Sequence, residues 1–152
     1  MARWQDVVDS APEFAAKVQT LFEAGRHKTL ATLRKDGSPR ISGIECQFKD
    51  GDLWIGSGKS NRKAADLRRD PRLALHGPCP DPPDDPLAWP GDAKMSGRAV
   101  LVEKPRAADE PEADHFRIDI SEVVLTRVGG MDHLVVALWR PLAGLEETKV
   151  YN

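Results

Sequence analysis

The clearest structural signal lies in residues 28–48, KTLATLRKDGSPRISGIECQF, where two runs of strand-forming residues flank a turn. The runs are Lys28–Arg34 and Pro39–Phe48, and the turn is Lys35-Asp36-Gly37-Ser38. An Asp-Gly step is typical of tight hairpin turns, because glycine adopts positive φ at little steric cost. The segment therefore predicts an antiparallel hairpin.

Short strands with turn residues between them continue after this hairpin. Asp50-Gly51 supplies a second turn, and the further predicted strands are Leu53–Gly56, Arg72–His76, Lys94–Val102, Phe116–Val128 and Leu134–Trp139. Hairpin connections favour an antiparallel sheet, since parallel strands need long crossovers. Because closure removes exposed sheet edges, we expect a closed or nearly closed antiparallel barrel.

Two helices are predicted beside these strands. Apolar residues recur at helical spacing over residues 12–24, and Ser10 and Glu13 have the spacing of a capping box. A second helix is predicted over Asn61–Arg69, with Ser60 as its cap. The sequence thus predicts short helices on the flanks of the barrel.

Two segments are predicted as loops. Six of the twelve prolines fall within residues 77–92, which therefore cannot form a sheet ladder. Trp89 in this loop is a candidate lid over a planar ligand. Residues 103–114 are acidic and form either a loop or a short helix.

Length and composition are those of a single globular domain spanning residues 1–152, with 40% hydrophobic and 30% charged residues. The longest uninterrupted apolar run, residues 134–139, is far shorter than the roughly 20 residues of a membrane-spanning helix. The first residues include acids and lack an apolar segment of signal-peptide length. We therefore expect a cytoplasmic protein without a membrane partner.

Positive charge is concentrated in one part of the chain. Residues 26–72 hold 12 Lys and Arg against 6 Asp and Glu, a net charge of +6, whereas residues 73–152 hold 8 against 14, a net charge of −6. A compact basic region suggests an anionic ligand. An isoelectric point of about 6.1 does not support a nucleic-acid partner.

The densest cluster of candidate functional residues is Ser57-Gly58-Lys59-Ser60-Asn61-Arg62-Lys63, between a predicted strand and a predicted helix. Backbone N–H groups at a helix start are unpaired and carry partial positive charge, so they can bind phosphate. The spacing is not that of a Walker A loop. A solvated basic helix start is the alternative interpretation.

A second candidate is the strand that contains Arg40 and Ser42. Residues two apart on a strand share a face, so Arg40, Ser42 and Ile44 are expected on one side. A buried arginine on this strand would need an anionic partner, whereas an exposed one would not.

Known catalytic and metal-binding patterns are missing from the sequence. Cys46 and Cys79 form no C-x-x-C pair and are interpreted as reduced, buried or semi-buried thiols. The four histidines are scattered, so no metal site is expected. No side-chain acid–base machinery is evident and the catalytic residues stay unassigned, so any catalysis would depend on a cofactor.

Three segments resemble the pyridoxamine 5'-phosphate oxidase-like family: residues 30–44, 53–57 and 62–75. The most specific element is Arg62-Lys63 followed by Asp70-Pro71-Arg72, after a strand that ends in Ser57; residues 96–99 resemble the next strand. The resemblance covers about residues 12–140. It implies a β-rich (α+β) fold, an antiparallel split β-barrel of six to seven strands with flanking short helices. It also implies a homodimer with cofactor sites at the interface.

The resemblance further implies a cofactor site for FMN, or alternatively for the deazaflavin coenzyme F-420. The residues implied for phosphate are Arg40, Ser57, Arg62 and Lys63; those implied for the same loop are Lys59, Ser60 and Asn61; those implied beside the ring are Ser42 and Ile44. The implied function is an oxidoreductase that transfers a hydride between the cofactor and a small organic substrate. The alternative is a non-catalytic flavin- or haem-binding carrier or sensor.

Three departures from the family pattern argue against vitamin B6 oxidation. True pyridoxamine phosphate oxidases have lysine where Glu45 lies and an aromatic residue where Gly56 lies. Their C-terminal segment carries arginine and histidine for the substrate, and residues 142–152 lack this feature. The substrate therefore stays open.

Overall fold

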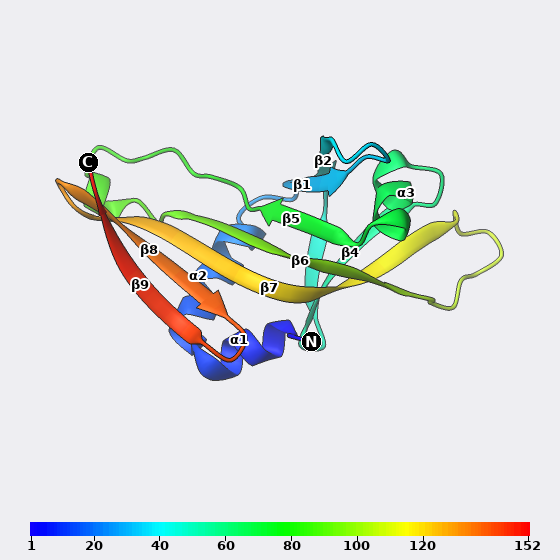
Figure 1. Cartoon of the computed structure of the whole chain (residues 1–152), viewed down its shortest axis with the longest axis horizontal. Helices are drawn as coiled ribbons and strands as arrows, with labels where there is room; N and C mark the ends of the chain where they lie inside the picture. Colours follow the sequence, from blue (N-terminus) through cyan, green and yellow to red (C-terminus); the bar gives the residue numbers. More distant parts are fainter.

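The computed structural model describes residues 1–152 as one nine-stranded antiparallel sheet with three α-helices (Figure 1). The helices are α1 (Trp4–Ser10), α2 (Pro12–Glu23) and α3 (Arg62–Arg69), with one 3-10 turn, η1 (Pro86–Ala88). The strands are β1 (Lys28–Leu33), β2 (Pro39–Ile44), β3 (Cys46–Lys49), β4 (Asp52–Gly58), β5 (Arg72–His76), β6 (Asp92–Val102), β7 (Ala113–Gly130), β8 (His133–Arg140) and β9 (Gly144–Tyr151). No helix is long and apolar enough to cross a bilayer.

The sheet curls into a barrel that is split along one seam. The strand order is β2-β1-β5-β6-β7-β4-β3, so β2 and β3 occupy its two ends. These strands are consecutive in the chain and separated only by Glu45. Residues of β2 also contact β4 across the seam, although no strand pairing joins these edges. The predicted antiparallel barrel is confirmed, with nine strands instead of the predicted six to seven.

One predicted strand, Pro39–Phe48, is two strands in the structure. Strand β2 pairs with β1, and β3 pairs with β4, on opposite sides of the seam. Glu45 carries the chain across the gap and is exposed. Local sequence preference cannot reveal this break, because both halves favour extended structure and only the closure of the barrel separates them.

The long strand β7 connects the barrel to an outer pair of strands. Its N-terminal part pairs with β4, and its C-terminal part pairs with β8, which then pairs with β9. Figure 1 shows β8 and β9 following the C-terminal part of β7 away from α3. Strand β9 was not predicted. Its side chains are mostly exposed on both faces, so its sequence lacks the apolar–polar alternation of a half-buried strand.

Helices α1 and α2 cover part of the sheet and complete one continuous core of 26 buried residues. Helix α2 matches the predicted helix over residues 12–24, whereas α1 was not predicted. The predicted capping box is wrong, because Ala11 is the N-cap of α2. The Ser10 hydroxyl instead accepts a hydrogen bond from Trp139 Nε1 at 2.6 Å, which joins the helices to β8.

Candidate functional site

The connection from β4 to α3 forms one wall of the site. Helix α3 begins at Arg62 with Asn61 as its N-cap, so the predicted cap Ser60 lies one residue too early and is exposed. Asn61 does not cap the helix through its side chain; its Nδ2 donates to Ser57 Oγ at 3.3 Å. Ser57 is buried beneath this contact. The loop is therefore stabilised by contacts among the predicted phosphate-binding residues themselves.

Strand β2 forms the opposite wall. Its residues alternate in exposure, with Arg40, Ser42 and Ile44 on the more buried face and Ile41 and Gly43 exposed. This confirms the predicted shared face. Lys63 of α3 reaches across the seam, and its Nζ donates to Gly43 O at 3.3 Å.

A buried carboxylate, Asp66, joins the two walls. Its Oδ2 accepts hydrogen bonds from Arg40 Nε and Thr32 Oγ1, each at 2.7 Å, and its Oδ1 accepts one from Arg69 at 2.9 Å. Asp66 is only 3% exposed as a side chain, whereas Arg40 is 18% exposed. Burial alone would raise the pKa of Asp66, but the hydrogen bonds from Arg40, Thr32 and Arg69 outweigh it and lower the pKa to about 2. The carboxylate therefore stays ionised at neutral pH.

Arg40 and Arg62 open into one cavity of about 410 Å³, which we call the basic hollow. Its lining residues come from the β1–β2 turn, β2 and one face of α3: Arg34, Lys35, Asp36, Arg40, Arg62, Ala65, Asp66 and Arg69. Five of these are cations and two are acids. The basic hollow is therefore suited to an anion.

The other predicted site residues lie around this cavity rather than in its wall. Lys59 turns toward the β6–β7 connection, where its backbone N–H donates to Glu112 O at 3.2 Å and its Nζ lies 4.0 Å from the Glu112 carboxylate. Ser57, Ser60, Asn61 and Lys63 lie on the same loop and helix start. Ser42 and Ile44 continue the face of Arg40 along β2.

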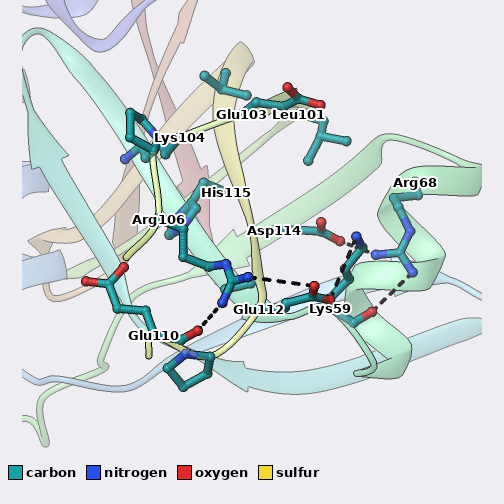
Figure 2. A pocket seen from close by; sticks show the side chains of 14 residues that line it. Lys59, Arg68, Leu101, Glu103, Lys104, Arg106, Glu110, Glu112, Asp114 and His115 are labelled. Carbon is teal, nitrogen blue, oxygen red and sulfur yellow. Dashed lines mark hydrogen bonds and ion pairs between the residues drawn. The ribbon is translucent and has the colours of Figure 1, made fainter. Parts of the chain in front are cut away.

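The Lys59 side chain belongs to a second cavity, the hairpin hollow, between the β6–β7 connection, the β4–α3 loop and the last turn of α3 (Figure 2). The Arg68 guanidinium pairs there with Asp114, and Arg106 lies 4.0 Å from Glu112. Its lining contains four basic residues and four carboxylates: Lys59, Arg68, Lys104 and Arg106, and Glu103, Glu110, Glu112 and Asp114. Because these charges offset one another, the hairpin hollow attracts a free anion less than the basic hollow does.

Six residues of the basic hollow were not among the predicted site residues: Arg34, Lys35, Asp36, Ala65, Asp66 and Arg69. A signal for two of them was present, because Asp66 and Arg69 follow Arg62 at spacings of four and seven, on one face of a helix. The turn residues Arg34 and Lys35 carry no such pattern. Only the folded hairpin brings them beside α3.

Trp89 lies away from the basic hollow of its own chain: its Nε1 donates to Pro80 O at 2.9 Å, and the residue lines a separate cavity with α2 and Leu125. Its role as a lid over a planar ligand stays a prediction. The interpretation of Cys79 needs correction. Cys79 is exposed rather than semi-buried, whereas Cys46 is partly buried. Burial raises the pKa of the Cys46 thiol to about 11.

A family profile described as pyridoxamine 5'-phosphate oxidase matches residues 14–132, more than half of the chain. The chain belongs to the pyridoxamine 5'-phosphate oxidase family. This confirms the resemblance of residues 30–44, 53–57 and 62–75. No curated protein sequence matches the chain.

Solved structures agree with this family and with the split barrel. An FMN-binding, pyridoxamine 5'-phosphate oxidase-related protein from Nostoc punctiforme is 13% identical, with 100% of this chain and 99% of that chain covered and a TM-score of 0.63. An F-420 reductase is 17% identical, with 69% and 94% covered and a TM-score of 0.53. A haem-binding protein from Mycobacterium smegmatis is 15% identical, with 89% and 86% covered and a TM-score of 0.54. At these identities the likeness shows the fold.

Proposed function

We propose that this member of the pyridoxamine 5'-phosphate oxidase family is an oxidoreductase that binds FMN or the deazaflavin coenzyme F-420. The single observation that carries the proposal is the basic hollow between β2 and α3, which Arg40 and Arg62 line. The family membership and the solved structures of an FMN-binding protein and an F-420 reductase support it.

The donor set of the basic hollow fits a phosphate group. Arg40 is oriented by Asp66 through its Nε, so its remaining guanidinium N–H groups are free for a ligand. Arg62 has no ion-pair partner in the chain and lies in the first turn of α3, where the helix dipole also favours an anion. We assign the phosphate to Arg40 and Arg62. Ser57, Asn61 and Lys63 hold the loop and helix in position.

The chain's own contribution to the reaction is binding and orientation. When bound, the cofactor ring supplies the hydride chemistry. Ser42 and Ile44 continue the face of Arg40 along β2, where Ile44 is buried in the core, and we propose that this part of β2 would lie beside the ring. The Asp66 carboxylate accepts hydrogen bonds from three side chains and has a pKa of about 2. It therefore does not act as a proton donor near neutral pH. The substrate we expect is a small organic molecule that exchanges a hydride with the ring.

Titration with FMN and with coenzyme F-420 tests this proposal by calorimetry. The variants Arg40→Ala and Arg62→Ala should each weaken binding by roughly tenfold or more, because each removes a charge-assisted hydrogen bond of about 1.5 kcal/mol or more. Arg127→Ala, which removes an exposed cation on β7 outside the basic hollow, should leave the affinity unchanged. Equal affinities for the site variants and Arg127→Ala would contradict the phosphate assignment.

A second candidate function is a flavin- or haem-binding carrier or sensor. It is favoured by the ionised, hydrogen-bonded state of Asp66, which leaves this buried carboxylate unable to donate a proton near neutral pH. The structural likeness to a haem-binding protein is compatible with it. Steady-state turnover of the bound cofactor with an electron acceptor would exclude this candidate, and tight binding without turnover would favour it.

The partner we propose is a second copy of the chain, with the cofactor sites at the interface. Analytical ultracentrifugation with and without FMN measures the mass directly. A monomer under both conditions would contradict the proposed homodimer.

A further inference from the structure

The basic hollow holds more positive charge than one phosphate neutralises. It contains five cations and two carboxylates, which gives a formal charge of 5 − 2 = +3. A phosphate monoester carries about −1.5 to −2 near neutral pH. A ligand with a single phosphate would therefore leave at least about one unit of positive charge uncompensated in the cavity.

The two arginines outside the proposed phosphate contact, Arg34 and Arg69, each donate a hydrogen bond to a backbone carbonyl. Arg69 donates to Leu33 O at 2.8 Å and to Asp66 Oδ1 at 2.9 Å, and Arg34 donates to Pro39 O. A guanidinium has five N–H donors, so each of these side chains retains donors for a ligand. Lys35 has no ion-pair partner in the chain and adds an exposed charge from the turn. Arginines that are already hydrogen-bonded bind anions with a smaller loss of side-chain entropy than free ones.

The two acids of the basic hollow form no ion pair with Arg34 or Lys35. Asp66 is buried behind Arg40 and Arg69 rather than free to pair with the turn. The Asp36 carboxylate accepts hydrogen bonds from Ser38 N at 2.9 Å and Ser38 Oγ at 2.6 Å, which lower its pKa and keep it within the turn. Arg34 and Lys35 consequently form no ion pair, although the charge of Arg34 also helps to lower the pKa of Asp36.

We propose that the basic hollow binds two anionic groups, the first at Arg40 and Arg62 and the second at Arg34, Lys35 and Arg69. The second group is a phosphate or carboxylate, carried either by the cofactor or by the substrate. The anion at Arg40 and Arg62 rests on the proposed function. The anion at Arg34, Lys35 and Arg69 is inferred only from the cavity and its charges.

Inorganic pyrophosphate and orthophosphate are suitable ligands for a test, because they differ in the number of phosphate groups. Calorimetry at constant ionic strength should show pyrophosphate binding roughly tenfold or more tighter than orthophosphate, since it contacts both groups of cations. Equal affinity of the unmodified protein for the two anions would overturn the proposal.

A paired variant and a matched control separate this site from general surface charge. Arg34→Gln with Lys35→Gln keeps the side-chain stems and should remove most of the preference for pyrophosphate, while orthophosphate binding falls by less than about threefold. Arg127→Gln with Lys149→Gln removes the same charge from β7 and β9 and should leave the preference intact. The assignment would be contradicted if both double variants lost the preference for pyrophosphate equally, or if both kept it.

Competition with FMN and with coenzyme F-420 distinguishes the two sources of the second group. One outcome is that protein saturated with either cofactor still binds orthophosphate and loses this binding in the double variant Arg34→Gln with Lys35→Gln. In that case the second group belongs to the substrate. If FMN leaves orthophosphate binding intact but coenzyme F-420, whose longer tail carries further anionic groups, excludes orthophosphate while the pyrophosphate preference of the free protein holds, the second group belongs to the cofactor. Selective pyrophosphate binding without binding of FMN or coenzyme F-420 would refute the proposed function and leave the two-anion site standing.

Discussion

Replacing Asp66 by Asn tests whether the buried carboxylate holds the seam together. The substitution keeps the size of the side chain but removes the negative charge that Arg40 and Arg69 share. Thr32 and Arg40 approach Asp66 from strands β1 and β2, so the contact forms only in the folded chain. We therefore expect D66N to destabilise the protein substantially.

The size of the effect follows from the pKa of Asp66. Folding lowers this pKa from an ordinary 3.8 to about 2. At about 1.4 kcal/mol per pKa unit, the ionised carboxylate contributes about 2 kcal/mol at neutral pH. Loss of the charge also leaves the mostly buried Arg40 guanidinium unpaired, which is costly. Together these give an expected loss of about 2–3 kcal/mol in the free energy of unfolding.

Urea unfolding followed by tryptophan fluorescence measures this loss. Asp70→Asn is the matched control: the pKa of Asp70 is also lowered to about 2, by hydrogen bonds from Arg72. That pair is exposed and only two residues apart, so it remains available in the unfolded chain and should contribute little to stability. Equal effects of D66N and Asp70→Asn at pH 7 would refute the structural reasoning.

The pH dependence gives an independent check of the same prediction. Because the pKa of Asp66 is depressed by folding, its stabilisation is present above the ordinary pKa of 3.8 and is lost as pH falls toward 2. The charge-dependent difference between the unmodified protein and D66N should therefore be roughly halved at pH 3 relative to pH 7. A difference that stays constant from pH 7 to pH 3 would show that the carboxylate charge is not responsible.

Two further predictions concern single sites. Ellman's reagent should rapidly modify one thiol per chain, the exposed Cys79, because burial raises the pKa of Cys46; the C79S variant should lose the fast phase. Gly97→Ala should destabilise the protein by about 3 kcal/mol or more, because its Cβ would lie 2.2 Å from Asp119 O, whereas Gly43→Ala meets no atom within 4 Å and should be far milder. Comparable urea midpoints for the two alanine variants would contradict this close packing.

The candidate site was only partly predictable from the sequence. The two-residue repeat of a strand predicts that Arg40, Ser42 and Ile44 share one face, and the alternating burial of β2 confirms this. The helix start at Arg62 follows from local signals, with an error of one residue at its cap. Asp66 could not be recognised as the partner of Arg40, because this contact joins residues 26 positions apart across the seam.

Local physics explains what the sequence determined by itself. Turn residues at Asp36-Gly37 and Asp50-Gly51, alternating strands and the helix over residues 12–23 depend on backbone preferences and periodicity, which act over a few residues. The antiparallel barrel, its family and the basic character of residues 26–72 were therefore evident from the sequence.

Tertiary structure decided the features that depend on long-range closure. The break at Glu45 exists because β2 and β3 lie at opposite ends of the strand order, and β9 exists because β8 offers an edge to pair with. The basic hollow forms because the β1–β2 turn folds onto α3, which brings Arg34 and Lys35 beside Arg62 and Arg69. The sequence shows which charges are available, but only the folded split barrel determines which of them line the basic hollow.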